Sequence, residues 1–371
     1  MSISSDKMET FIQACLLCLC ALLINVNGDC LPSQRCVLFN QCPELLALVQ
    51  QNPLPKQVVE RLQRLQCGYD RRANHPKVCC DQKVESLPTP DSSLFPSTDV
   101  CGQDPNKRIV GGQLTELRQF PWLVLLEYQK PDGRGFQCGG SLINEKYIVT
   151  AAHCVINIPR SWQLISVRLG EHDLDNDPDC EDADRPGFED CAASPIDIPV
   201  GEIITHPNYK AREVSKPNDI ALIRLSRPVT YSKSISPICL PTKSQFLNNR
   251  YDGVNMMVAG WGRTENSSQS KIKLKLEVPV NSEQECSTLY KKHGAILNDG
   301  QICAGGQKGK DSCSGDSGGP LMYLERTPPE YNWYLYGIVS FGPIQCGTKD
   351  FPGIYTLVPK YMKWITDNLK P

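Results

Sequence analysis

The sequence has little net charge and no long apolar run. Its 39 lysines and arginines nearly balance 41 aspartates and glutamates, so the formal net charge at pH 7 is −2. Nucleic-acid-binding proteins use a cationic surface field, which this composition does not supply. Residues 11–26, FIQACLLCLCALLINV, are apolar but too short to cross a bilayer as a helix. We therefore expect no nucleic-acid partner and no membrane span.

The apolar stretch is instead typical of a secretory signal peptide. Val26 and Gly28 supply small residues at a cleavage point, so residues 1–28 are predicted to be removed. The alternative is an anchoring helix, which the polar residues Asn25 and Asp29 disfavour because they end the segment early. The prediction is a secreted, extracellular protein.

Cysteine is the most informative residue type in the chain. Three of the 19 cysteines (Cys15, Cys18 and Cys20) would be removed with the signal peptide. The remaining cysteines are even in number, which in a secreted chain predicts that all pair as disulfides in an oxidising compartment. Secretion also makes Asn266, in Asn-Ser-Ser, a predicted glycosylation acceptor.

Cysteine density divides the mature chain. Residues 30–80 form a short segment dense in cysteine that cannot bury a self-sufficient core, so disulfides must staple it. Residues 81–107 are rich in Pro, Ser, Asp and Thr, which is typical of a linker. From residue 109 onward, short β-branched and aromatic runs are punctuated by Gly and Pro, which predicts an all-β sandwich or barrel. The end, YMKWITDNLK, predicts one amphipathic helix that docks on it.

Three short motifs carry the chemistry: TAAHC at 150–154, NDIAL at 218–222 and GDSGGP at 315–320. Each has an ordinary structural interpretation on its own, as a core histidine, a strand cap or a glycine turn. Together, in the order His, Asp, Ser in a secreted β-rich chain, they indicate a nucleophilic serine activated by a histidine base.

On these motifs, residues 109–371 resemble a chymotrypsin-type serine protease, and residues 30–80 resemble the clip domain of arthropod clip-domain proteases. The resemblance implies two antiparallel six-stranded β-barrels with a C-terminal helix, preceded by a small disulfide-knotted clip domain. The implied boundaries are a signal peptide at 1–28, a clip domain at 29–80, a linker with an activation site at 81–108, and a peptidase domain at 109–371.

The resemblance also implies a role for each catalytic residue. Ser317 is the expected nucleophile, His153 its general base, and Asp219 the group that orients the imidazole, as in the Ser-His-Asp template. Ser340 resembles the family serine that hydrogen-bonds the aspartate. The backbone N–H groups of Gly315 and Ser317 are expected to form the oxyanion hole. This chemistry needs no cofactor.

A trypsin-like specificity pocket is the next implication. Asp311 lies at the position that forms the pocket floor in the trypsin-like branch, and a buried carboxylate favours a guanidinium or ammonium partner. Gly342 and Gly353 would leave the walls open for a long side chain. We expect cleavage after Arg first and Lys second, while a purely structural Asp311 is the alternative. The crowded stretch FGPIQCG leaves the further subsites open.

The stretch KRIVGG at 107–112 predicts a zymogen. In the family, cutting here frees an α-ammonium on Ile109, which pairs with the aspartate before the nucleophile, Asp316. Before the cut that buried charge lacks its partner, so the catalytic loops are expected to be disordered. Because Lys107 and Arg108 precede the bond, the activator is itself expected to be trypsin-like.

Disulfide pairs follow from the resemblance. The clip pattern suggests Cys30–Cys79, Cys36–Cys67 and Cys42–Cys80, among the 15 connectivities that six cysteines allow. The protease pattern suggests Cys138–Cys154, Cys286–Cys303 and Cys313–Cys346, with Cys101–Cys239 tethering the N-terminal part after activation and Cys180–Cys191 closing an extra loop.

That extra loop, GEHDLDNDPDCEDADRPGFEDC, is strongly acidic. One interpretation is a solvated surface hairpin. The other is a structural Ca²⁺ site, since trypsin-like relatives hold calcium in this loop and hard cations prefer oxygen ligands. Glu171 and Asp179 would supply carboxylates, and Asp173 and Asn176 backbone carbonyls.

The sequence therefore predicts a secreted trypsin-like zymogen in an extracellular cascade, in haemolymph if the source is an arthropod. Its expected partners are protein substrates (other zymogens or a pro-cytokine), an upstream trypsin-like protease and a serpin inhibitor. The resemblance points to innate immunity, through melanisation or Toll-ligand processing. The alternatives are a developmental patterning protease, a non-catalytic clip-domain cofactor and, less favoured, a digestive trypsin.

Overall fold

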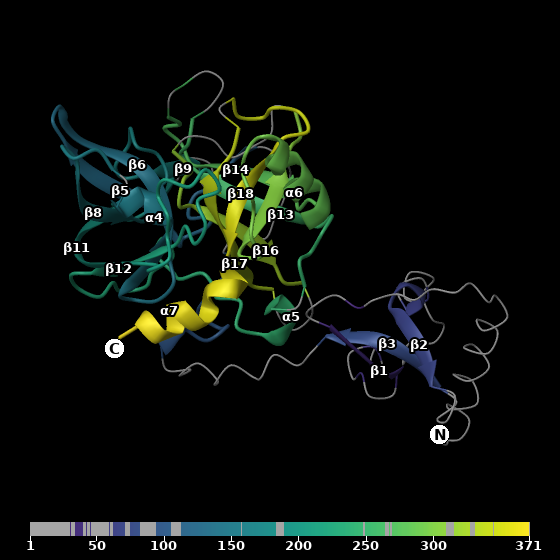
Figure 1. Ribbon diagram of the computed structural model, residues 1–371. Coiled ribbons are helices and arrows are strands. Elements are labelled where there is room, and N and C mark those ends of the chain that lie inside the picture. The colour runs from purple at the N-terminus through teal and green to yellow at the C-terminus, as the bar shows by residue number, and fades with distance from the viewer. Residues whose placement is uncertain are drawn as a thin grey trace, which may run out of the picture. The chain divides into compact units, whose positions relative to one another are not determined.

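The protein is described by a computed structural model that divides into two compact units, Met1–Leu87 and Pro88–Pro371 (Figure 1). The structure describes residues 30, 34–39, 42, 45, 59, 62–70, 75–81, 94–104, 113–156, 158–182, 189–247, 249–263, 267, 269–308, 315–326, 331–343 and 345–370. Within these residues no helix is both long and apolar enough to span a membrane.

The N-terminal unit is a three-stranded antiparallel sheet in the order β1-β3-β2, formed by Gln34–Leu38, His75–Asp81 and Gln66–Asp70. Its apolar cluster is small and includes Phe39, Leu45 and Val78. Three disulfides join its strands and loops: Cys30–Cys79, Cys36–Cys67 and Cys42–Cys80. These pairs are the ones that the clip resemblance implies, and they compensate for a core too small to fold unaided.

The first sheet of the C-terminal unit is a closed barrel in the order β11-β12-β7-β6-β5-β8. Its strands are β5 Leu123–Lys130, β6 Gly133–Leu142, β7 Tyr147–Thr150, β8 Gln163–Leu169, β11 Ile196–Thr205 and β12 Ala221–Leu225. The apolar run in β5 and all of β7 are buried, as expected for strands that face a barrel interior.

The second sheet has seven strands in the order β15-β18-β17-β16-β13-β14-β4. They are β4 Gln113–Leu114, β13 Asn255–Gly260, β14 Leu274–Pro279, β15 Gln301–Gly305, β16 Pro320–Leu324, β17 Trp333–Phe341 and β18 Pro352–Leu357. A single bridge between Val280 and Ala304 brings the chain after β14 back to β15. Six strands thus form the second barrel of the predicted fold, and β4 adds a seventh at the edge of β14.

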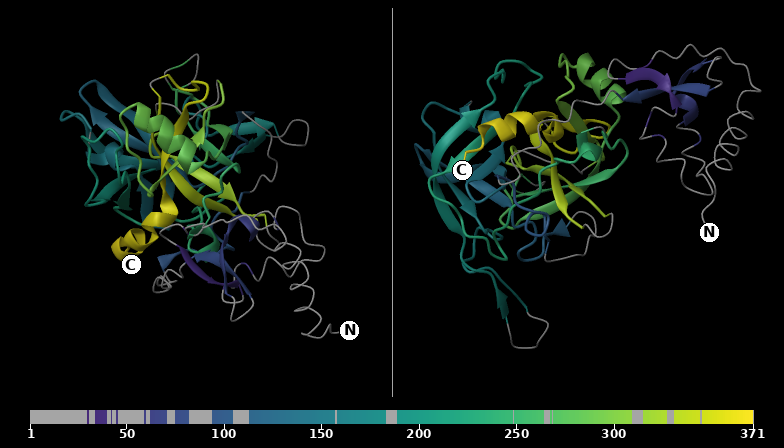
Figure 2. Two further views of the ribbon diagram at one scale, coloured as in Figure 1. Left: turned by 45° about the vertical axis from the view of Figure 1, so that its right-hand side comes forward. Right: turned by 90° about the horizontal axis from the view of Figure 1, so that it is seen from below.

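Among the described residues of the C-terminal unit, the helices are few and short. They are α4 Ala152–Ile156, α5 Ser244–Leu247, α6 Glu283–Lys292, the 3-10 helix η3 Val358–Tyr361 and α7 Met362–Asn368. The predicted C-terminal helix is confirmed: Met362, Ile365 and Leu369 are buried in the core shared by the two barrels. Strands β9 Cys180–Asp182 and β10 Glu189–Cys191 form a hairpin that extends away from the barrels in both views of Figure 2.

Residues 94–104, expected to be linker, are fixed on the C-terminal unit. Leu94 and Phe95 pack against its core, and Cys101 is bonded to Cys239. The Gly102 carbonyl accepts from Trp333 N at 3.0 Å, which extends the edge of β17. Composition misses this docking because the contacts are made by two apolar residues, one disulfide and backbone groups within an otherwise polar segment.

Candidate active site

The imidazole of His153 and the carboxylate of Asp219 form the centre of the site. Nδ1 of His153 lies 2.7 Å from Oδ2 of Asp219, and the backbone N–H of His153 donates to Oδ1 at 2.9 Å. Ser340 Oγ donates to Oδ2 at 2.5 Å. Burial opposes ionisation of Asp219, yet the charge of His153 and these hydrogen bonds hold the pKa of the carboxyl below its ordinary value. The pair is built to orient the ring and to stabilise it when it takes a proton.

The Ser317 turn packs directly against β6 and against the end of β7, just before His153. Gly139 N donates to the Ser317 carbonyl at 2.8 Å. The next residue, Gly318, has a φ of +79°, and a Cβ there would collide with Thr150 and Gly139. Only glycine fits this approach, which explains the glycine after the serine in GDSGGP.

The backbone before Ser317 has the conformation that an oxyanion hole requires. Gly315 has a φ of +103°, and a Cβ there would lie 3.0 Å from the Cα of Gly262. The positive φ of Gly315 is compatible with the expected oxyanion hole, whose donors would be the N–H groups of Gly315 and Ser317.

Asp316 lies between these two donors in sequence, and its carboxylate occupies a slot between two glycines. The N–H of Gly262 donates to Oδ1 of Asp316 at 2.9 Å. A Cβ on either Gly260 or Gly262 would collide with the carboxylate. The two glycines of VAGWG thus let the carboxylate lie deep beside the Ser317 loop.

Comparison with known proteins identifies the family to which this chain belongs. The Trypsin family matches residues 109–365, and the family described as Regulatory CLIP domain of proteinases matches residues 25–80. The chain is a clip-domain serine protease. It is thus a serine endopeptidase, a hydrolase of the trypsin family.

Its relatives carry related names. CLIP domain-containing serine protease B4 of Anopheles gambiae is 42% identical over 94% of this chain and 94% of its own. In Drosophila melanogaster, Spaetzle-processing enzyme is 41% identical over 93% of this chain and 92% of its own. Melanization protease 1 is 40% identical over 91% of each. The crystal structure of the Drosophila Grass clip serine protease of the Toll pathway matches with a TM-score of 0.65 and 32% identity, over 92% of this chain and 97% of that chain.

The predicted specificity pocket is described only in part. A Cβ on Gly342 would lie 3.6 Å from the Cα of Gly353, so the two glycines face each other across a narrow gap. Asp311, the predicted floor, lies outside the described residues. Four other residues named in the predictions also lie outside the described residues: Arg108, Ile109, the predicted glycosylation acceptor Asn266, and Cys313.

The other disulfides of the protease unit are formed as the resemblance implies: Cys138–Cys154, Cys180–Cys191 and Cys286–Cys303. Cys346, whose expected partner is Cys313, is also disulfide-bonded. The Cys138–Cys154 bond joins β6 to the helix that begins beside His153, so it stabilises the general base directly.

The acidic loop of the protease brings Glu171 and Asp179 together. Both are buried, and the N–H of His172 donates to Glu171 Oε1 at 2.9 Å and to Asp179 Oδ2 at 3.1 Å. Burial raises the pKa of both carboxyls, and the charge of Asp179 adds to the effect on Glu171. Two buried carboxylates that face one amide form an oxygen donor set that fits a hard cation. Asp173 and Asn176 lie in the turn between them, where Asn176 N donates to the Asp173 carbonyl at 3.1 Å.

Two functional neighbours escaped the sequence analysis. Thr356 Oγ1 donates to the backbone carbonyl of Asp219 at 2.8 Å across 137 residues of sequence. The ammonium of Lys273 is buried beside the acidic loop and donates to the Glu171 carbonyl at 3.3 Å. The local signal for Lys273 is a lysine directly before the apolar strand β14.

Proposed function

We propose that this protease is a secreted zymogen that is activated by cleavage after Arg108 and then cuts protein substrates after arginine, with lysine second. The observation that carries the proposal is the position of Asp316, the residue between Gly315 and Ser317, whose half-buried carboxylate is held against Gly260 and Gly262. A carboxylate in that slot is suited to hold a cationic chain terminus.

The activation step follows from that position. Cleavage of the Arg108–Ile109 bond by water gives a carboxylate on Arg108 and an α-ammonium on Ile109. The ammonium would pair with Asp316 and fix the loop of Gly315 and Ser317. The pairing would thus couple cleavage of one bond to the order of the catalytic loop. Two points of sequence support the proposal: the basic pair before Ile109 and the glycines after Val110.

Secretion is supported by the predicted signal peptide and by seven disulfides among the described cysteines, which suit an oxidising compartment. Relatives named Melanization protease 1, Spaetzle-processing enzyme and Phenoloxidase-activating factor 1 support a role in an extracellular cascade of innate immunity, with zymogens or a pro-cytokine as substrates. The serpin inhibitor and the upstream trypsin-like activator are proposed from the family resemblance alone. A role in developmental patterning would use the same chemistry. The converged His153–Asp219 pair disfavours a non-catalytic cofactor.

The acidic loop adds a structural element to this proposal. Glu171 and Asp179, with the backbone carbonyls of Asp173 and Asn176, would hold one Ca²⁺. Arg168 already pairs with Glu171 at 3.3 Å, so the ion would share this carboxylate with the guanidinium. It would brace the loop and take no part in hydrolysis.

The test of the proposed function uses the purified full-length chain, before and after cleavage by a trypsin-like protease. The cut protein should hydrolyse an arginyl p-nitroanilide, whereas the uncut protein and the Arg108→Gln variant should be nearly inert. A matched Lys107→Gln variant, which keeps Arg108, should still be activated. Wild-type turnover by intact Arg108→Gln would refute the activation step, and an inert cut protein would refute the proposed specificity.

A further inference from the structure

Asn218, the residue before Asp219, has a backbone conformation that few side chains adopt. Its φ is +60°, in the left-handed region where asparagine is tolerated better than most residues. The carbonyl of Asn218 accepts from Ile220 N at 2.8 Å, so the chain turns sharply at Asp219. The direction of the Asp219 side chain depends on this turn.

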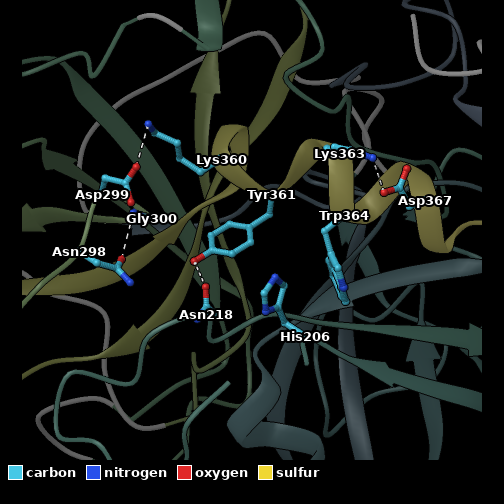
Figure 3. Close-up of a pocket in the computed structure, with 10 residues that line it drawn as sticks. All are labelled: His206, Asn218, Asn298, Asp299, Gly300, Lys360, Tyr361, Lys363, Trp364 and Asp367. Carbon is cyan, nitrogen blue, oxygen red and sulfur yellow. Dashed lines mark hydrogen bonds and ion pairs between the residues drawn. The ribbon is translucent and has the colours of Figure 1, made fainter. Parts of the chain in front are cut away.

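Both ends of the Asn218 side chain are held. Nδ2 donates to the Asn208 carbonyl at 3.0 Å, which ties the start of the loop before Asp219 to its end. The hydroxyl of Tyr361 lies 3.1 Å from Oδ1 and donates to it, as Figure 3 shows. Through this hydrogen bond, the side chain of Tyr361 connects the C-terminal helical segment to Asn218, the residue before Asp219.

Tyr361 is itself fixed for this contact. It is buried at the end of η3, and the ring of His206 packs edge-on against it with centroids 5.4 Å apart. A Cβ on Gly300 would collide with the tyrosine hydroxyl, so glycine is needed there. Gly300 is held in turn by Leu357 N, which donates to its carbonyl at 2.8 Å.

Asp219 is thus held from its backbone as well as from its carboxylate. Thr356 Oγ1 binds its carbonyl, and Asn218 fixes the turn before it, while the carboxylate receives His153 and Ser340. A side chain that orients a catalytic base must be fixed to within a fraction of an ångström, because small misplacements reduce the rate strongly.

We propose that Asn218 and Tyr361 are positioning residues of this protease: the Tyr361 hydroxyl holds Asn218 in its left-handed turn, and the turn aims the carboxylate of Asp219 at Nδ1 of His153. Neither residue touches substrate. The inference rests on the serine endopeptidase activity and is independent of which protein is cut.

The contact lies at the wall of a cavity of about 400 Å³, lined by His206, Asn218, Asn298, Lys360, Tyr361 and Trp364 among others (Figure 3). Because the cavity opens to solvent, water can replace the hydroxyl in Tyr361→Phe, and this variant should fold. The loss should therefore be seen in turnover more than in stability.

The experiment compares activated wild type, Tyr361→Phe, Asn218→Ala, Asn218→Gly and the double variant Tyr361→Phe/Asn218→Ala. Active sites are counted with an organophosphorus reagent, so that misfolded protein does not enter kcat. Tyr361→Phe should lower kcat about three- to tenfold with KM unchanged, and Asn218→Ala about 10- to 100-fold. Asn218→Gly should recover part of the loss because glycine adopts a positive φ freely. The double variant should be no slower than Asn218→Ala, since both residues act through one contact.

The matched control is Tyr147→Phe, which removes another buried tyrosine hydroxyl, one that accepts from Lys370 N at 3.1 Å. It should leave kcat unchanged. A proton resonance from the His153–Asp219 hydrogen bond should broaden in Tyr361→Phe and stay sharp in Tyr147→Phe. Three outcomes would overturn the proposal. They are a wild-type kcat in Tyr361→Phe, equal kcat losses in both phenylalanine variants, and additive kcat losses in the double variant. An inactive wild type would bear on the activity alone.

Discussion

The carboxylate of Asp316 and the N–H of Gly262 form a 2.9 Å hydrogen bond between the Ser317 loop and the segment that follows β13. No side chain fits at Gly262, because a Cβ there would overlap the carboxylate. The geometry of the nucleophile loop therefore depends on a glycine more than fifty residues away in sequence.

Gly262→Ala should for this reason lose most of its activity after cleavage at Arg108. The added methyl group displaces the Asp316 carboxylate, and the N–H groups of Gly315 and Ser317 move with it. Each oxyanion donor contributes about 3–4 kcal/mol to transition-state stabilisation, so kcat should fall by roughly 10²-fold or more. The measurement is kcat with an arginyl p-nitroanilide. Gly135→Ala is the matched control, since its Cβ would meet only the flexible end of Lys130 at 3.4 Å. Equal activity of the two variants would contradict the argument.

Replacement of the predicted pocket floor should separate specificity from catalysis. In Asp311→Ser the substrate guanidinium would lose its charge partner at a cost of about 3–5 kcal/mol, or roughly 10²–10⁴-fold in kcat/KM for arginyl substrates. Reaction of Ser317 with a small organophosphorus reagent should persist. Unchanged arginine preference would show that another residue forms the floor.

Calcium should stabilise the protein through Glu171 and Asp179. A ligand at 100 times its dissociation constant adds about 2.7 kcal/mol of stability, which for a domain of this size is roughly 5–10 °C in Tm. We expect Tm to rise with CaCl₂ and to fall with chelator. Asp179→Asn should abolish the response. Asp175→Asn, which alters an exposed partner of Lys271 in the same loop, should keep it. A wild-type Tm unaffected by either addition rules the site out.

The Cys101–Cys239 bond should keep the two parts of the cut chain together. After cleavage at Arg108, the wild type should run as one band on a denaturing gel without reductant and as two with it. The double variant Cys101→Ser/Cys239→Ser should give two bands in both conditions. Removal of the Cys180–Cys191 pair, which lies wholly after the cut, should leave a single band. Separation of the cut wild-type chain without reductant would disprove the tether.

His206 should make stability depend on pH. Burial holds the pKa of this half-buried imidazole below its ordinary value, whereas the unfolded chain titrates near ~6.5. Just below that pH the unfolded state binds more protons than the folded state, so stability rises with pH and is lost on acidification. Denaturation at pH 7.5 and 5.5 should show a smaller loss for His206→Gln than for wild type. The exposed control His293→Gln should behave as wild type. Equal losses in all three proteins would assign the pH dependence to other groups.

Sequence alone identified the residues whose chemistry is local. The motifs around His153, Asp219 and Ser317 can each be recognised from a few consecutive residues. The short apolar runs indicated a barrel fold. What it missed are contacts between distant segments: Thr356 with the Asp219 carbonyl, Tyr361 with Asn218, and the bridge from Val280 to Ala304. These depend on how the second barrel and the C-terminal helix pack, which no local pattern encodes. One hint was present, since an asparagine directly before a catalytic aspartate is a residue that tolerates the left-handed turn.

The docking of residues 94–104 and the bond from Cys101 to Cys239 also set where the mature enzyme can work. A protease whose N-terminal unit stays covalently joined cannot diffuse away from whatever that unit binds. If the chain is cut after Arg108 as proposed, any surface that retains the small unit would confine peptide-bond cleavage to its own neighbourhood.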